Sequence, residues 1–339
     1  MHMMKHESPE TMLPILQDQY GRIKRKLRIS VTDRCNFKCV YCMPEHPEWM
    51  KKQDLLSFEA LLIFCQYMVK QGIENIRITG GEPLMRKGVV HFIRDLQSLR
   101  AIGLKRISIT TNGHYLAKYA EQLKQAGLDD LNISLDSMDA DQFKQLTKKD
   151  LAPVLSGIQA AQRVGLPFKI NCVLIKGQNE DQILPMVNWA KQQNIPLRFI
   201  EFMPLDGDQH WTDQAVVSEA DILAQLQPHY DIHVLQQQHE PARQYRLDDQ
   251  YTIGIISTIT HSFCGDCDRI RLTAQGELYN CLFAQQGLNI KPYLQRAIKE
   301  KTFQQLDQQI KPYIWHKAKG YHAIQNQQVR KISMHMLGG

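Results

Sequence analysis

The chain repeats one local pattern six times: a short apolar, β-branched run ends in a polar or glycine-rich turn and is mostly followed by an amphipathic segment. We predict strands at Leu27–Val31, Asn75–Thr79, Arg106–Thr110, Asp130–Leu135, Phe168–Ile175 and Leu197–Phe202. Strand–helix units joined by right-handed crossovers give a parallel sheet, and this number of units favours an incomplete (β/α)6 barrel of the TIM type. In such a sheet, functional residues collect at the carboxyl ends of the strands.

The carboxyl-terminal third follows a different pattern. After about residue 235 the order is strand, turn, strand, as in Gln244–Leu247, Tyr251–Ser257 and Ile270–Leu282, with a helical segment near Pro292–Lys311 behind them. We therefore predict an α/β fold in which residues 1–235 form the partial barrel and residues 236–339 form a smaller α+β domain. The boundary lies in a polar segment that ends in proline, Gln236–Pro241.

Composition excludes several classes of protein. With 339 residues, 43% of them apolar, the chain can bury a large core, but no stretch is apolar enough to span a membrane. The amino terminus lacks the order of charged, apolar and small residues that marks a secretion signal. Basic residues exceed acidic ones by six without a long basic block. We therefore expect a cytoplasmic protein with neither nucleic acid nor membrane as a partner.

Eight cysteines in a cytoplasmic chain indicate metal binding or catalysis, because disulfides are rare in a reducing compartment. Cys35, Cys39 and Cys42 share one loop directly after the first predicted strand. Such a loop can direct three thiolates at one metal centre, and a four-iron cluster held by three thiolates keeps one iron open for chemistry. A zinc site without its fourth ligand and a packed cysteine cluster are the alternatives.

A second trio, Cys264, Cys267 and Cys281, again offers three thiolate ligands. Two close cysteines precede a predicted strand, and the third lies on the returning strand of a hairpin. We interpret the trio as a second iron–sulfur site, with a zinc ribbon that uses His261 as fourth ligand as the alternative. The two remaining cysteines are isolated within apolar patterns, which favours core packing.

The turn Gly80–Pro83, Gly-Gly-Glu-Pro, follows the second predicted strand and so lies beside the first cysteine loop. Two glycines allow a backbone to approach a ligand closely, and the proline fixes the exit of the turn. Together with the cysteine spacing and Tyr41, this turn resembles the radical S-adenosylmethionine enzymes. The second trio, the run Asp268–Arg271 and the terminal Gly338-Gly339 resemble the branch of that family that acts on GTP in molybdenum cofactor biosynthesis.

The resemblance implies two [4Fe-4S] clusters. S-adenosylmethionine would bind the open iron of the first cluster and be cleaved by one electron to methionine and a 5'-deoxyadenosyl radical. Tyr41, Gly81, Ser134 and Met203 match the positions that hold this cofactor in the family. For Met203 alone, the residues themselves would favour core packing.

The resemblance also implies that the second cluster binds the guanine of GTP. The radical would remove the ribose 3' hydrogen, so that the 3' carbon attacks carbon 8 of the base. Arginine forks suit the triphosphate because they match phosphate oxygens and stay charged. The expected substrate contacts are Arg28, Arg77, Thr110, Lys169, Arg269, Ile270 and Arg271. Catalytic roles would fall to Arg269 and Arg271 and to Gly338 and Gly339 of the tail, which in the family reaches into the active site.

The sequence also leads to expectations about the protein's partners and about alternative functions. The resemblance implies an electron donor of unknown identity and cyclic pyranopterin monophosphate synthase as the next pathway enzyme, with a homodimer as one option for assembly. The alternatives are a radical enzyme that modifies a peptide and a non-catalytic, metal-stabilised binding module. Asp268 departs from the asparagine common in the family and adds a negative charge beside the arginines, for which the sequence offers no reason.

Overall fold

The computed structural model describes residues 15–205, 211–235, 240–323 and 333–338. Six parallel strands form the partial barrel, and each agrees with its predicted range to within one residue at either end. They are β1 Lys26–Ser30, β2 Asn75–Thr79, β3 Arg106–Thr111, β4 Asp130–Ser134, β5 Phe168–Leu174 and β6 Leu197–Glu201. The barrel is not closed, which confirms the predicted α/β fold with an incomplete barrel.

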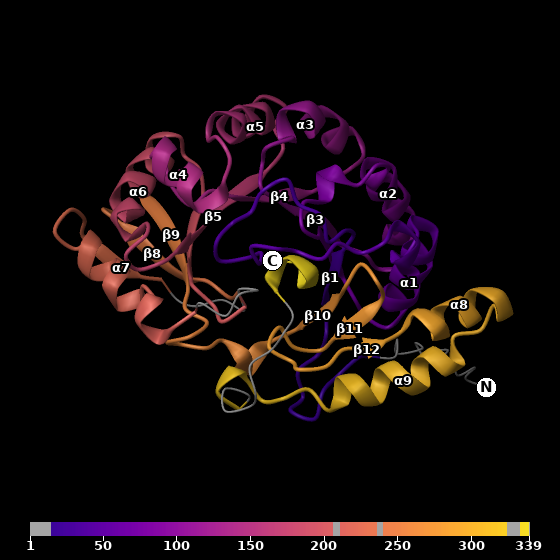
Figure 1. The fold of residues 1–339 in the computed structure, drawn as a ribbon. Coiled ribbons are helices and arrows are strands. Elements are labelled where there is room, and N and C mark those ends of the chain that lie inside the picture. Colours follow the sequence, from indigo (N-terminus) through magenta and orange to yellow (C-terminus); the bar gives the residue numbers. More distant parts are fainter. Residues whose placement is uncertain (1–14, 206–210, 236–239, 324–332, 339) are drawn as a thin grey trace, which may run out of the picture.

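Helices cover the outer face of the curved sheet (Figure 1). They are α1 Phe58–Lys70, α2 Val89–Leu96, α3 Leu116–Gln125, α4 Ala140–Thr147, α5 Ala152–Arg163, α6 Ile183–Gln192 and α7 Glu219–Leu226. Helix α1 begins where the Ser57 side chain accepts a hydrogen bond from the amide of Ala60 at 3.2 Å. Cys65 in α1 and Cys172 in β5 are fully buried, which confirms core packing for the two isolated cysteines.

The barrel strands have one apolar face and one polar face. Ile76 and Ile78 of β2, and Ile107 and Ile109 of β3, are fully buried in the core that the sheet shares with the helices. The intervening residues project to the other side, because successive side chains of a strand alternate. They line a central cavity and include Arg28, Arg77, Ser108, Thr110, Asn132, Lys169, Asn171 and Arg198. The interior of this barrel is therefore a polar chamber.

The carboxyl-terminal strands extend both edges of the barrel within a single sheet, in the order β12-β11-β10-β1-β2-β3-β4-β5-β6-β9-β8-β7. Their bounds are β7 Ile232–Val234, β8 Arg243–Leu247, β9 Tyr251–Ile256, β10 Arg269–Leu272, β11 Glu277–Tyr279 and β12 Leu288–Asn289. Strand β9 pairs parallel with β6, and β10 pairs parallel with β1. Most of the predicted boundary segment, residues 236–239, lies outside the described residues, so the division into two domains stays a prediction.

Two details differ from the sequence prediction. The helical segment near Pro292–Lys311 is two helices, α8 Lys291–Glu300 and α9 Gln304–Trp315, because Lys301 adopts a left-handed conformation with φ 55° that ends α8. Cys281 was expected on the returning strand of the hairpin, but β11 ends at Tyr279 and the cysteine follows it. The last helix is α10, Met334–Leu337.

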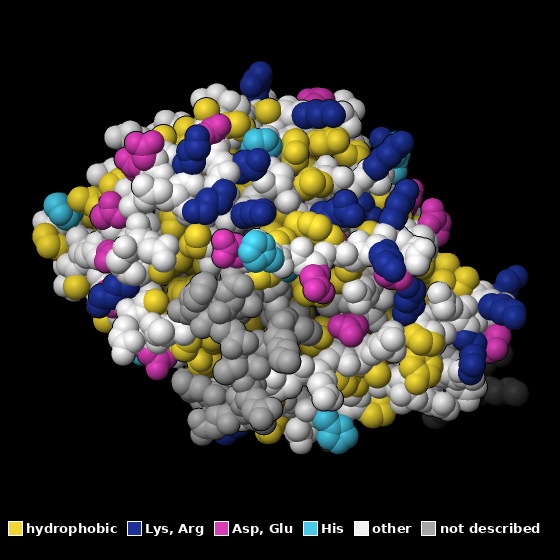
Figure 2. All heavy atoms as spheres, viewed as in Figure 1, with side chains coloured by type: hydrophobic (Ala, Val, Ile, Leu, Met, Phe, Trp, Pro, Cys, Tyr) yellow, Lys and Arg dark blue, Asp and Glu magenta, His cyan; other side chains and the backbone are white. Residues whose placement is uncertain are grey.

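The outer surface mixes charges of both signs. On the face drawn in Figure 2, lysine and arginine side chains are spread among acidic and polar ones. None of the helices in the described ranges is both long enough and apolar enough to cross a membrane.

Candidate active site

The loop of the first cysteine trio packs directly on the glycine turn. The amide of Gly81 donates to the carbonyl oxygen of Thr32 at 2.7 Å, and the amide of Glu82 donates to that of Arg34 at 2.8 Å. A Cβ atom on Gly81 would lie 2.4 Å from the Arg34 carbonyl oxygen and 2.5 Å from that of Asp33. The glycine is therefore required because two backbones meet at this point, immediately before Cys35.

The cysteines of the first trio lie close together, and one of them has N–H donors beside its sulfur. Burial raises the pKa of Cys39 and of Cys42, and the charges of neighbouring thiols of the trio raise both further, so the three cysteines lie close together. Cys35 Sγ accepts hydrogen bonds from the amide of Phe37 at 3.4 Å and from Asn112 Nδ2 at 3.7 Å. Such N–H···S bonds accompany cysteines that hold iron–sulfur clusters, so the residues present fit a cluster.

Two polar residues of this region, Asp136 and Asn112, were missed by the sequence analysis, and Glu82 was named there only as part of the glycine turn. Asp136 follows β4 and accepts a hydrogen bond from Tyr41 Oη at 2.6 Å. The carboxylate of Glu82 accepts from the amide of Asn112 at 2.8 Å and from Thr111 Oγ1 at 2.9 Å. Burial raises the pKa of Glu82 to about 7. The available signal was their position, since each polar residue stands just after a strand of the barrel.

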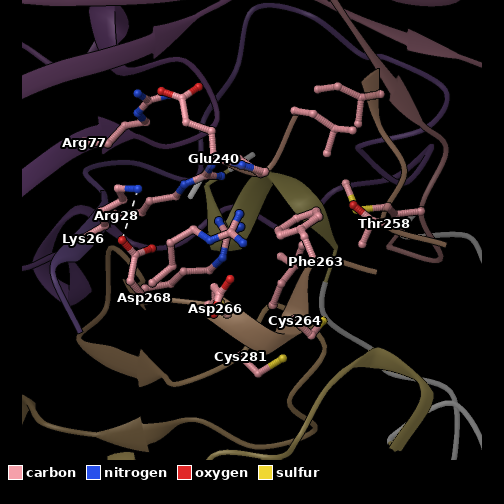
Figure 3. Close-up of a pocket in the computed structure, with 18 of the residues that line it drawn as sticks. Lys26, Arg28, Arg77, Glu240, Thr258, Phe263, Cys264, Asp266, Asp268 and Cys281 are labelled. Atoms are coloured by element: carbon pink, nitrogen blue, oxygen red, sulfur yellow. Dashed lines mark ion pairs between the residues drawn. The ribbon is translucent and has the colours of Figure 1, made fainter. Parts of the chain in front are cut away.

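The central chamber is a cavity of about 680 Å³. Figure 3 shows Arg77 and Glu240 across the cavity from Cys264 and Cys281, with Arg28 in between. The cations that line it are Lys26, Arg28, Arg77, Arg106, Lys169, Arg198, Arg243, Arg269, Arg271 and Lys317. Acidic lining residues are fewer, namely Glu240, Asp266 and Asp268. The volume suits a small molecule, and the charge favours a polyanion.

Arg28 is crowded by other cations. Burial, followed by the charges of Arg271 and Arg77, holds the pKa of its guanidinium well below the usual range. Like charges buried together destabilise a site unless an anion offsets them. The positive charge of the chamber therefore favours the binding of a ligand that carries several negative charges.

Arg198 of β6 is a further cation that the sequence analysis missed. Its Nε donates to Asn171 Oδ1 and its Nη2 donates to Asn132 Oδ1, both at 3.0 Å. These amides hold the guanidinium in the chamber beside Lys169, whose pKa is lowered by burial and by the charge of Arg198. The position of Arg198 between Leu197 and Phe199, two apolar residues of β6, was the signal that could have placed it on the inner face.

All three cysteines of the second trio line the same chamber. Burial alone would raise the pKa of Cys267, but the charges of Arg269 and Lys317 lower it to about 5. A thiol held as thiolate among cations fits a metal ligand. Within the described ranges, no three His, Cys, Asp or Glu side chains are arranged to hold a single metal ion. His261, the alternative zinc ligand, lies 3.7 Å from the Glu219 carboxylate with its side chain 56% exposed.

Asp268 has a partner that accounts for its charge. Its carboxylate lies 3.1 Å from Lys26 Nζ, and this ion pair is drawn in Figure 3. The negative charge that the sequence left unexplained is therefore balanced locally by a lysine of β1.

The sequence resemblance implies GTP as the ligand, and Asp268→Asn is accordingly expected to change its Kd by less than about fivefold, because a partly exposed ion pair contributes at most ~1 kcal/mol. Anaerobic calorimetry on the parent and the variant checks this. Binding that becomes more than about tenfold tighter would mean that the Asp268 charge opposes the nucleotide and that Lys26 does not balance it.

The carboxyl-terminal tail enters the chamber region. Arg271 Nη1 donates to the carbonyl oxygen of Gly338 at 2.6 Å. Gly338 has φ +73°, and a Cβ atom on it would lie 1.8 Å from Thr79 Oγ1. Only a residue without a side chain fits this position. Gly339 lies outside the described residues.

The remaining predicted site residues lie in two groups. Thr110 and Met203 line the central chamber with the predicted arginines and Lys169. Ile270 is fully buried in the apolar core between Arg269 and Arg271 and does not line the chamber. The first trio, Tyr41, Gly81 and Ser134 are not lining residues either; they lie at the carboxyl ends of β1, β2 and β4 and in the loops that follow.

Comparison with known proteins agrees with this geometry. Residues 29–190 match the model of the radical SAM superfamily, and residues 195–323 match the model named Molybdenum Cofactor Synthesis C. A GTP 3',8-cyclase from Listeria monocytogenes is 42% identical over 85% of this chain and 88% of its own. Another from Staphylococcus aureus is 35% identical over 97% of this chain and 100% of its own.

Two solved structures share the fold. SuiB of Streptococcus suis bound to S-adenosylmethionine superposes with a TM-score of 0.62 at 14% identity, covering 86% of this chain and 68% of SuiB. The protein anSMEcpe with bound AdoMet and a peptide superposes with a TM-score of 0.54 at 17% identity, covering 92% of this chain and 94% of its own. At these identities the likeness concerns the fold alone.

The partial barrel, the three-cysteine loop and the glycine turn packed on it define a radical S-adenosylmethionine enzyme. The second trio belongs to its carboxyl-terminal half, and the cationic chamber is lined both by the barrel strands and by that half. At 35–42% identity over most of its length, the chain belongs to the GTP 3',8-cyclase family of molybdenum cofactor biosynthesis.

Proposed function

We propose that the chain converts GTP to (8S)-3',8-cyclo-7,8-dihydroguanosine 5'-triphosphate, the first step of molybdenum cofactor biosynthesis. The observation that carries this proposal is the composition of one chamber, which combines a wall of arginines and lysines with the second cysteine trio. A nucleoside triphosphate has complementary parts, a polyanion and a nitrogen-rich base that can ligate a metal. The names of the relatives agree with this substrate.

The first site is proposed to hold one [4Fe-4S] cluster and S-adenosylmethionine. When bound, this pair supplies a 5'-deoxyadenosyl radical able to remove the 3' hydrogen of the ribose. The chain would position the cofactor: Asp136 orients Tyr41 through a 2.6 Å hydrogen bond, and the amide of Gly81, bonded to Thr32, holds the glycine turn against the loop. Ser134 is the last residue of β4 and Met203 follows β6 by two residues, where they would complete the cofactor site.

The chamber is proposed to bind GTP in one orientation. Arg77, Lys169 and Arg198 would hold the triphosphate, because several positive partners in a confined space are needed to replace the water around it. Thr110 and Arg28 would contact the rest of the nucleotide. Ile270 has no side chain in the chamber, so its proposed contact would come from its backbone.

The base is proposed to lie at the second trio, which would hold a second [4Fe-4S] cluster through Cys264, Cys267 and Cys281. Arg269 and Arg271 stand beside this trio on β10, and Arg271 also holds the tail through Gly338. These arginines and the two tail glycines would orient the base for ring closure. The electron donor, transfer of product to cyclic pyranopterin monophosphate synthase, a homodimer and a cytoplasmic location remain predictions.

Arg198→Met tests the proposed phosphate subsite. The Kd of GTP is expected to rise roughly 10- to 100-fold, since a charge-assisted hydrogen bond contributes about 1.5–3 kcal/mol, whereas guanosine binding should change little. Anaerobic calorimetry with GTP and guanosine measures both. The matched control is Arg246→Met, an exposed arginine of β8 outside the chamber. Equal losses for GTP and guanosine, or no loss for either, would contradict the proposed orientation.

A further inference from the structure

Four charged side chains are buried behind the second cysteine trio. Asp18, Arg22 and Lys24 precede β1, and Lys317 follows α9. Their exposed fractions are 0%, 8% and 0% for the first three and 2% for Lys317. Charged side chains are rarely buried this fully unless they are paired, because leaving water costs several kcal/mol per ion. The hydrogen bonds that these four side chains form therefore indicate the role of the charged cluster.

Asp18 pairs two of the cations and directs them at the cysteine loop. Its Oδ2 accepts hydrogen bonds from Arg22 Nε and Lys24 Nζ, both at 2.6 Å. Arg22 Nη1 also donates to the carbonyl oxygen of Cys264 at 2.8 Å, and Lys24 Nζ donates to that of Cys267 at 2.9 Å. Hydrogen bonds from Arg22 and Lys24 thus hold the backbone of Cys264 and Cys267.

Lys317 contacts a ligand atom itself. Its Nζ donates to Cys267 Sγ at 3.2 Å and to the carbonyl oxygen of Arg269 at 3.1 Å. Together with Arg22 and Lys24 it makes three cations against the single carboxylate of Asp18. A net positive charge therefore lies buried behind the second trio.

The first trio has buried carboxylates as neighbours. Glu82 and Asp136 are 0% and 2% exposed. The Glu82 carboxylate accepts a hydrogen bond from the amide of Asn112, whose Nδ2 donates to Cys35 Sγ, and Asp136 accepts one from Tyr41, the residue before Cys42. Reduction of an iron–sulfur cluster adds one negative charge. Hydrogen bonds to the ligand sulfurs and nearby cations favour the reduced form, whereas nearby carboxylates disfavour it.

We propose that Lys317, supported by Asp18, Arg22 and Lys24, is a positioning residue that raises the reduction potential of the second cluster above that of the first. The inference rests on the proposed second cluster. One electron from an external donor reduces either cluster, and the buried ammonium group stabilises the extra charge only at the second site. Electrons supplied to the protein therefore collect first at the end of the chamber where the base is proposed to bind.

The test uses a background with Cys35, Cys39 and Cys42 changed to alanine, so that only the second site can load. Dithionite titration followed by electron paramagnetic resonance gives the midpoint potential, and iron and sulfide analyses give the loading. Lys317→Met is expected to shift the reduction equilibrium at least tenfold toward the oxidised form, a fall of about 59 mV for one electron. Lys317→Arg should keep most of the parent potential, and Lys311→Met, an exposed lysine of α9, should match it.

A second background, with Cys264, Cys267 and Cys281 changed to alanine, gives the potential of the first cluster, which is expected to be the lower of the two. An unchanged potential in loaded Lys317→Met protein would overturn the inference and leave the two-cluster function standing. If Lys317→Met does not load, Lys317→Gln, which keeps a donor without the charge, takes its place in the titration under the same criterion. A parent protein that binds no iron at the second site would overturn the second cluster itself, and this inference with it.

Discussion

Deletion of Gly338 and Gly339 is expected to lower GTP cyclisation at least about a hundredfold while both cysteine trios keep their iron. The carbonyl oxygen of Gly338 accepts a 2.6 Å hydrogen bond from Arg271, an arginine that is 5% exposed and lines the substrate chamber. Removing the tail removes this acceptor and changes how the guanidinium is held beside the base. Losing one preorganised electrostatic contact in an active site commonly costs about 2.7–4 kcal/mol.

Gly338→Ala tests the same contact with the full chain length. The added Cβ would lie 1.8 Å from Thr79 Oγ1, so the tail must move away from its position. We expect a loss of turnover similar to that of the deletion, measured as cyclised nucleotide per iron. The matched control is Gly165→Ala, which also has positive φ but meets nothing within 4 Å. Full turnover in the truncated protein would show that the tail has no part in the reaction.

Gly81→Ala is expected to lower the rate of 5'-deoxyadenosine formation by about a hundredfold or more. The new methyl group would meet the carbonyl oxygens of Arg34 and Asp33 at 2.4 and 2.5 Å. Both contacts are with backbone, so no side-chain rotation relieves them, and the loop that leads into Cys35 must shift. A displacement of about 1 Å at a reacting centre costs on the order of 100-fold in rate.

Product analysis of anaerobic reactions measures this effect, with iron content checked on the same samples. Gly165→Ala again serves as control: its positive φ should cost about 1 kcal/mol in unfolding free energy, with little effect on 5'-deoxyadenosine formation. The prediction fails if Gly81→Ala protein forms 5'-deoxyadenosine at the parent rate.

Periodicity was sufficient to predict the barrel. Strands such as β2 and β6 carry enough isoleucine, leucine and phenylalanine to be recognised, and each is followed by a helix or a turn with clear composition. The way in which the carboxyl-terminal strands join the sheet could not be predicted. β9 and β10 pair with β6 and β1 across long stretches of sequence, and that pairing depends on tertiary packing.

The residues of the candidate site also form two groups, those that a sequence motif predicts and those that only the folded chain brings together. Residues within recognisable motifs, such as the two cysteine trios and the glycine turn, were predicted, and most of them gather around the chamber or the loop beside Gly81. Arg198 and Lys317 were missed, because no local motif distinguishes them from ordinary surface cations. Their roles depend on contacts with Asn171 and Cys267, which only the folded chain brings together.

Reaction of the reconstituted protein with GTP tests the central claim most directly. The protein is loaded anaerobically with iron and sulfide and then incubated with S-adenosylmethionine, dithionite and GTP, while 5'-deoxyadenosine and cyclised nucleotide are quantified. We predict that both products form in equal amounts and only when GTP is present. Formation of 5'-deoxyadenosine without any cyclised nucleotide would contradict the substrate, and formation of neither product by protein with both clusters intact would contradict the radical cyclase function itself.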